Sequence, residues 1–84
     1  MYTQIKDIEH IKDLTAELPR EFALMLKGGL CTRKIISYDR EDDLFYVDDL
    51  CTGCISSYTE AQLAEQTNIV RAARRGALYM DNNN

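Results

Sequence analysis

The stretch that decides the fold is KIISYDREDDLFYVDDLCTGCISSY, residues 34–58. It contains two apolar runs rich in β-branched and aromatic residues, and a short charged turn, residues 39–43, joins them. Such runs on either side of a polar turn are typical of a β-hairpin. A third short run, residues 55–58, follows closely enough to add another strand. The sequence therefore predicts an antiparallel meander in the middle of the chain.

The alternation of side chains along this hairpin predicts which residues share a face of the sheet. One face is expected to carry Ile36, Tyr38, Phe45 and Val47. The opposite face is expected to carry Ile35, Ser37, Leu44 and Tyr46. Because both faces are partly apolar, we expect helices to cover one of them and a partner chain to cover the other.

The N-terminal part of the chain predicts a helix followed by a strand. Isoleucine and leucine recur at steps of three and four over residues 3–18, with Thr3 as a candidate N-cap and Pro19 as the residue that ends the helix. Residues 21–27 alternate like a strand with one buried face, although their composition would also suit a second helix. We favour the strand, which a glycine loop at residues 28–29 would connect to the hairpin.

The C-terminal part predicts two short helices and a last strand. Residues 59–62, TEAQ, match a capping box and predict a helix that ends near Gln66. A second helix is expected to begin at residue 67 or 68 and to run to about Arg75, just before a glycine. Residues 77–80 would then add a strand at the edge of the sheet.

Length and composition bound the class of protein. The 84 residues suffice for one domain, which we place at residues 1–80, with residues 81–84 as a disordered tail. The expected fold is α+β, with an N-terminal helix, a three- or four-stranded antiparallel β-meander and short C-terminal helices packed on one face. The net charge of -4 disfavours nonspecific binding to nucleic acid or to anionic membrane. We find no membrane span and no secretory signal, which predicts a cytoplasmic protein.

Three cysteines and one histidine raise the question of a metal site. Cys51 and Cys54 form a C-x-x-C, and Cys31 and His10 complete a set of four side chains of the types that bind zinc. A structural zinc site usually has two such pairs, and this chain has one. A thioredoxin-like role is disfavoured, because that motif begins a helix and this one lies between two strands. We favour a tight turn flanked by small, half-buried cysteines, and we expect no cofactor.

Three arginines form a candidate site for an anion or a nucleic acid. Arg71, Arg74 and Arg75 share one face of the last predicted helix. Clustered cations can contact a phosphate backbone. Cations in the last helical turn also complement the helix dipole, and the negative net charge of the chain favours this second interpretation.

Tyrosines on the predicted sheet suggest a surface for a protein partner. Tyr38 and Tyr46, together with Leu44 and Ile35, are the candidate contact residues. Tyrosine suits a position where one end of the side chain is dry and the other is wet. The chain lacks a Ser/His/Asp order, a phosphate-binding glycine loop and a paired carboxylate, so we do not expect an enzyme.

Parts of the chain resemble short, uncharacterised accessory proteins of bacterial phages and conjugative elements. The resemblance lies in FALMLKGGLCTRKIISYD (residues 22–39), LFYVDDL (residues 44–50) and TEAQLAEQTNIVRAARRGALY (residues 59–79). It carries no catalytic motif. It implies a setting in which small proteins bind and modulate larger ones, in host defence, transcription or transfer.

The sequence thus ranks three functions. The first is a non-enzymatic protein-interaction module, with a homodimer through the sheet as one option. The second is a nucleic-acid-binding regulator that uses the arginine face, and the third is a small zinc module.

Overall fold

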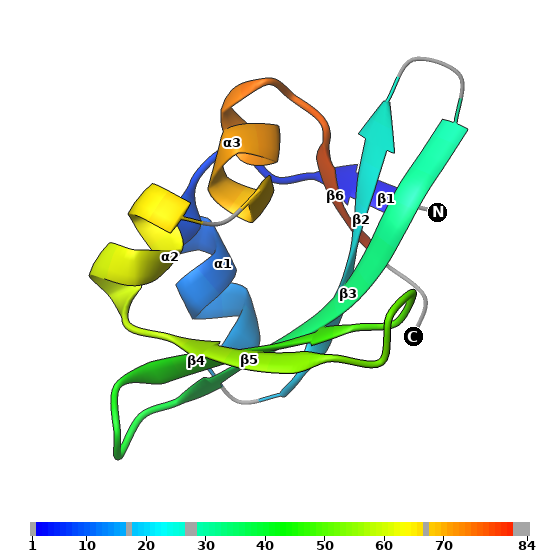
Figure 1. Cartoon of the computed structure of the whole chain (residues 1–84). Helices are drawn as coiled ribbons and strands as arrows, with labels where there is room; N and C mark the ends of the chain where they lie inside the picture. The colour runs from blue at the N-terminus through cyan, green and yellow to red at the C-terminus, as the bar shows by residue number, and fades with distance from the viewer. Residues whose placement is uncertain (1, 17, 27–28, 67, 82–84) are drawn as a thin grey trace.

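In the part of the chain that the structure describes, six antiparallel strands form one curved sheet, in the order β1-β6-β2-β3-β4-β5 (Figure 1). The computed structural model describes residues 2–16, 18–26, 29–66 and 68–81. The strands are β1 (Tyr2–Gln4), β2 (Arg20–Leu26), β3 (Gly29–Asp39), β4 (Leu44–Asp49), β5 (Ile55–Tyr58) and β6 (Leu78–Asp81). The helices are α1 (Ile8–Thr15), α2 (Glu60–Gln66) and α3 (Asn68–Arg74). All three lie on the same side of the sheet (Figure 1).

Strands β2 to β5 form the predicted meander, because each pairs with the next along the chain. The segment that could have been strand or helix is the strand β2. In the central hairpin Ile36 pairs with Val47 and Tyr38 pairs with Phe45. Directly paired residues point to the same face of a sheet, so the predicted division of this hairpin into two faces is confirmed.

The two ends of the chain differ from the prediction. The first helix begins at Ile8, and Thr3 lies in β1 rather than at a helix N-cap. Asp7 caps α1 instead, since its side chain accepts a hydrogen bond of 2.9 Å from the backbone N–H of His10. The last strand is not at the sheet edge, because β6 lies between β1 and β2. Asp81 is part of β6 rather than of a tail, and residues 82–84 lie outside the described residues.

One hydrophobic core lies between the sheet and the helices. It takes side chains from four strands, from all three helices and from the loop before α1. Its members are Ile5, Ile11, Phe22, Ile36, Phe45, Val47, Leu63, Ile69, Val70, Ala73 and Leu78. Burial of this apolar surface is the main stabilising term for so small a domain.

The C-terminal helices begin and end as their sequence predicts. The capping box is formed: Thr59 N–H donates to Gln62 Oε1 at 2.9 Å, and Gln62 N–H donates to Thr59 Oγ1 at 3.1 Å. Gly76 follows α3 with a φ of 74°, the left-handed conformation that favours glycine. The side chain of Gln4 donates to the Gly76 carbonyl at 2.9 Å and so ties β1 to this helix end. No described helix has the length and apolar content needed to cross a membrane.

Candidate functional site

The face of the sheet that the helices leave uncovered carries a group of apolar side chains. We call this group the open-face cluster, and its members are Ile35, Leu44, Tyr46 and Ile55. Tyr46 on β4 pairs with Ser37 on β3 and with Ser57 on β5, so these three side chains lie side by side on the uncovered face. The side chains of Tyr46 and Ile55 are 36% and 68% exposed, which makes them two of the exposed large apolar residues of the protein. Such a group on a sheet face is typical of a binding surface.

A carboxylate lies in the middle of this cluster. Asp48 pairs with Ile35 on one side and with Ile55 on the other, so the three side chains form a row across β3, β4 and β5. No ion pair or hydrogen bond from a described side chain reaches Asp48. The row therefore combines apolar contact area with one negative charge that the described part of the chain does not neutralise.

An ion-pair network marks the other half of the same face. Arg33 on β3 pairs with Glu21 on β2 and, at 3.8 Å, with Asp81 on β6. Ala23, on β2 between the neighbouring strands β3 and β6, is fully buried. This half of the face therefore carries paired charges, whereas the open-face cluster lies on the side of the sheet that ends at β5.

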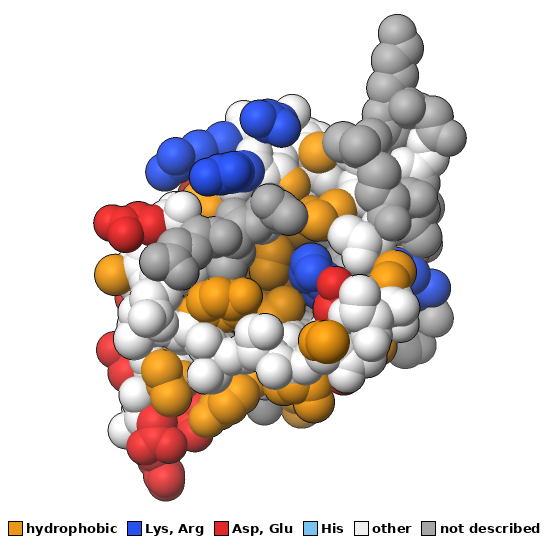
Figure 2. All heavy atoms as spheres, viewed as in Figure 1, with side chains coloured by type: hydrophobic (Ala, Val, Ile, Leu, Met, Phe, Trp, Pro, Cys, Tyr) orange, Lys and Arg blue, Asp and Glu red, His pale blue; other side chains and the backbone are white. Residues whose placement is uncertain are grey.

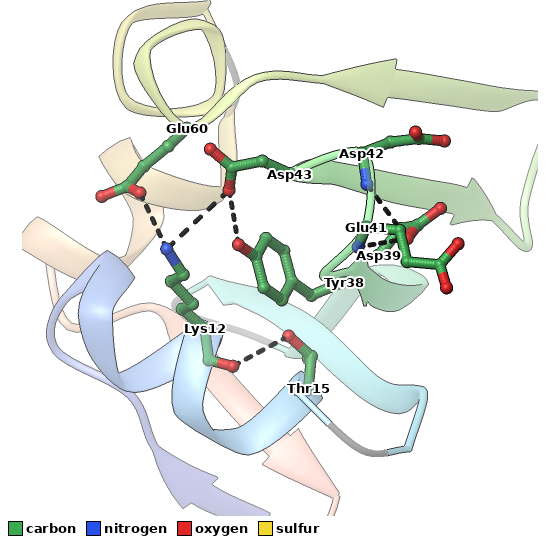
Figure 3. Close-up of polar contacts among 8 residues, drawn as sticks. All are labelled: Lys12, Thr15, Tyr38, Asp39, Glu41, Asp42, Asp43 and Glu60. Atoms are coloured by element: carbon green, nitrogen blue, oxygen red, sulfur yellow. Dashed lines mark hydrogen bonds and ion pairs between the residues drawn. The ribbon is translucent and has the colours of Figure 1, made fainter.

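Tyr38, the fourth predicted contact residue, lies on the helix-covered face. Its ring packs on Phe45 with the centroids 4.8 Å apart, and Lys12 Nζ lies 4.9 Å from its centroid. The Tyr38 hydroxyl donates to the Asp43 carboxylate, and Lys12 pairs with Glu60 at 3.3 Å and with Asp43 at 3.9 Å (Figure 3). Hydrogen bonding to Tyr38, and then to Glu60, raises the pKa of Lys12. These contacts connect α1, α2 and the β3–β4 turn, so the Tyr38 side chain stabilises the packing of these elements.

A shallow hollow joins the two faces at the β3–β4 hairpin. It has a volume of about 530 Å³ and lies between the segment after α1 and the hairpin. Its lining includes Leu18, which is 59% exposed, and both Tyr38 and Tyr46. The hollow thus extends the open-face cluster around the end of strands β3 and β4 toward the segment after α1.

The acidic turn at the tip of this hairpin is held by its own side chains. The Asp39 carboxylate accepts hydrogen bonds from the backbone N–H of Glu41 at 2.9 Å and of Asp42 at 3.3 Å (Figure 3). Asp43 adopts a positive φ of 53°. The turn is therefore a structured acidic tip.

The predicted arginine face is present and exposed. Arg71, Arg74 and Arg75 all lie on the surface at α3, and Figure 2 shows lysine and arginine side chains gathered at this end of the molecule. Among the described residues, no acidic side chain pairs with any of the three. Acidic side chains gather instead at the tip of the β3–β4 hairpin (Figure 2).

The candidate zinc ligands do not form a site in the part of the chain that the structure describes. No three side chains of histidine, cysteine or acidic residues come together there as metal ligands would. His10 lies in α1, whereas Cys51 and Cys54 lie in the turn between β4 and β5, which is away from α1 at the right of the view (Figure 1). The side chain of Cys31 is outside the described set. Cys51 and Cys54 are exposed, so the expectation of half-buried cysteines was wrong.

Sequence reasoning missed two parts of the surface. Ile55 was placed in a strand but not in the candidate contact set, although its alternation with Ser56 could have assigned it to the uncovered face. Leu18 was expected inside the first helix, and it lies beyond the end of α1 instead. The contact between Lys12 and Glu60, 48 residues apart, has no signal in the sequence.

Comparison with known proteins adds no relative. No protein-family model matches the chain, and neither the curated proteins nor the solved structures contain a significant match.

Proposed function

We propose that this protein is a non-enzymatic interaction module that binds a larger protein through the open-face cluster. The observation that carries this proposal is the exposure of Tyr46 and Ile55 on the sheet face that α1, α2 and α3 leave uncovered. Buried tyrosine anchors contribute much of the energy of many protein interfaces, and an isoleucine side chain gains free energy when an interface removes it from water.

The neighbouring edge of the sheet suggests how the partner engages. β5 is an edge strand, and its sequence ISSY contains no charge and no proline, the residues that usually protect an edge from pairing. An extended segment of the partner can therefore pair with β5 through its backbone, while alternate side chains reach Ile55 and Tyr46. Asp48, in the row between Ile35 and Ile55, favours a partner segment with a lysine or arginine among apolar residues.

The same carboxylate makes a heterologous partner a better fit than a second copy. Two copies paired along β5 would each bring Asp48 toward the shared surface, and the cation on the same face, Arg33, already pairs with Glu21 and Asp81 of its own chain. A homodimer through this face predicts a molar mass in light scattering that rises with concentration, and a heterologous partner predicts a constant one. We place the interaction in the cytoplasm, in the mobile-element setting that the resemblance implies.

Site-specific photo-crosslinking tests the proposal. A photoreactive amino acid in place of Tyr46 should capture one defined protein in the native host, and the same amino acid in place of Ala61, exposed on α2, should not. Ile55→Lys should then weaken binding of the captured protein by about tenfold or more, because it places a charge in the contact region. Ala61→Lys is the matched control, with the same added charge on the helix side. Equal capture from positions 46 and 61, or equal affinity of the two lysine variants, would refute the proposal.

The arginine face supports a second candidate function, a nucleic-acid-binding regulator. The supporting observation is that Arg71, Arg74 and Arg75 are exposed together and lack a described acidic partner. Binding to a phosphate backbone through three cations should weaken with salt, with a slope of about -2 to -3 in log affinity against log salt. The triple alanine variant should abolish that slope, whereas Ile55→Lys should leave it unchanged.

A further inference from the structure

The turn between β4 and β5 presents two thiols to solvent while its backbone is held by other groups. Asp49 N–H donates to the Cys54 carbonyl at 2.9 Å, and Gly53 N–H donates to the Asp49 carbonyl at 2.8 Å. The Asp49 carboxylate also accepts from the N–H groups of Cys51 at 2.9 Å and Thr52 at 3.3 Å. Gly53 adopts a φ of 74°, which glycine allows without strain. The turn thus holds its shape without using the sulfur atom of Cys51 or of Cys54.

Cys51 lies beside a hydrogen-bond donor from β3, because the Thr32 hydroxyl donates to Cys51 Sγ at 3.4 Å. The backbone N–H of Arg33, the next residue of β3, also favours the thiolate. These donors, with Thr32 the stronger cause, lower the pKa of the Cys51 thiol. The nearby Asp49 charge opposes the effect, but Lys34 pairs with Asp49 at 3.0 Å and offsets part of it. Donors in a neighbouring strand therefore supply what a helix N-terminus supplies in thioredoxin-like motifs.

Cys54 places a second exposed thiol on the same turn, three residues further along. Its N–H donates to the Thr52 hydroxyl at 3.3 Å, which fixes its backbone. A second thiol at this spacing can displace a group attached to the first and so make the modification reversible. A metal site on the same residues would need further ligands, and none of the described side chains supplies one.

We propose that Cys51-Thr52-Gly53-Cys54 is a dithiol site that reacts with low-molecular-weight disulfides of the glutathione type. The Cys51 thiolate attacks one sulfur of the disulfide, forms a mixed disulfide and releases one thiolate, which takes a proton from water. Cys54 loses its proton and attacks the Cys51 sulfur, which forms the Cys51–Cys54 disulfide and releases the second thiol. The protein dithiol is oxidised by two electrons, and the small disulfide is reduced to two thiols. This reaction is independent of the proposed partner binding.

Peptide mapping of the full chain after exposure to oxidised glutathione tests the proposal. Trypsin leaves Cys51 and Cys54 together on peptide 41–71 and Cys31 on peptide 28–33, so the two regions are read separately. In the wild-type protein we expect peptide 41–71 to lose two hydrogen atoms. Cys54→Ser should accumulate a mixed disulfide on Cys51, because the displacing thiol is gone. Cys51→Ser should react more slowly than Cys54→Ser.

A substitution of Thr32, the hydrogen-bond donor, tests whether the surroundings of Cys51 make it more reactive than an ordinary exposed thiol. Thr32→Val keeps the shape of the side chain and removes the hydroxyl, so it should slow the reaction of the Cys54→Ser protein at neutral pH on the order of threefold. It should also move the midpoint of the pH–rate profile upward. Ser56→Ala, which removes an exposed hydroxyl from β5, is the control and should change neither. Modification of peptide 28–33 alone, equal rates in the two serine variants, or an unchanged profile in Thr32→Val would overturn the proposal.

Discussion

Replacing Ile36 with alanine should remove a large part of the free energy of unfolding, whereas the same replacement at Ile55 should remove almost none. Both are isoleucines in neighbouring parts of one sheet, but Ile36 is 0% exposed on the helix-covered face and Ile55 is 68% exposed on the other. The pair therefore tests the assignment of the two faces with a single chemical change.

The magnitude follows from burial. Alanine removes three carbon atoms from Ile36, and their transfer from water is worth about 2.4 kcal/mol at about 0.8 kcal/mol each. The cavity that remains under α1 brings the expected loss to about 2–5 kcal/mol. A domain of this length is stable by roughly 4–13 kcal/mol, so the variant should be near the limit of folding. Ile55→Ala should stay within about 0.5 kcal/mol of the wild type.

Urea denaturation followed by circular dichroism measures both losses. With a slope near 1 kcal/mol per molar urea, the midpoint of Ile36→Ala should fall by roughly 2 M or more, and that of Ile55→Ala should barely move. Ile36→Val, with an expected loss of about 0.5–1.5 kcal/mol, keeps the comparison measurable if the alanine variant does not fold. Equal losses at positions 36 and 55 would refute the assignment of the faces.

Three further predictions concern the helix cap, a glycine and a carboxylate. Thr59→Ala removes the capping box of α2 and should cost about 0.5–2 kcal/mol in the same denaturation assay. Gly76→Ala and Gly53→Ala both place a side chain at a φ of 74°, but only at Gly76 does the new Cβ meet another side chain, at 2.7 Å from the Gln4 amide nitrogen. The Gln4 side chain must then move away and lose its hydrogen bond to the Gly76 carbonyl, so Gly76→Ala should cost about 0.5–1 kcal/mol more in thermal unfolding. The hydrogen bond from Lys34 is the main cause that lowers the pKa of the Asp49 carboxyl below 3.8. The ionised carboxylate therefore stabilises the folded state fully above that pH, and this contribution is lost as the pH falls through the folded pKa. Lys34→Met should make the free energy of unfolding fall less between about pH 5 and pH 2 than it does in the wild type.

The local parts of this fold could be predicted from the sequence. The faces of the central hairpin follow from alternation over a few residues, and the cap at Thr59 follows from a spacing of three. Pro19 follows the first helix as predicted, but the helix already ends at Thr15, before the predicted end at residue 18. In each case the residues that decide the structure are close together in the sequence.

The parts that were missed depend on contacts between distant residues. β1 is only three residues long and has no periodicity, and its partner β6 lies more than seventy residues away along the chain. The same holds for the surface. Exposure of Ile55 and of the thiols depends on which face the helices cover, and the donor at Thr32 reaches Cys51 only because β3 continues past the β4–β5 turn. Residue types indicated the chemistry of these groups, and only the assembled sheet shows what surrounds them.

The insertion of β6 between β1 and β2 has a consequence for biosynthesis. The first strand emerges from the ribosome early, yet its hydrogen-bonding neighbour is residues 78–81. Until those residues have been synthesised and released from the exit tunnel, β1 has no neighbour and one side of β2 stays unpaired. We therefore expect this sheet to close only after translation has passed residue 81, in a slow step governed by the meeting of distant segments. A nascent chain stalled before that point should remain sensitive to proteases and should bind chaperones.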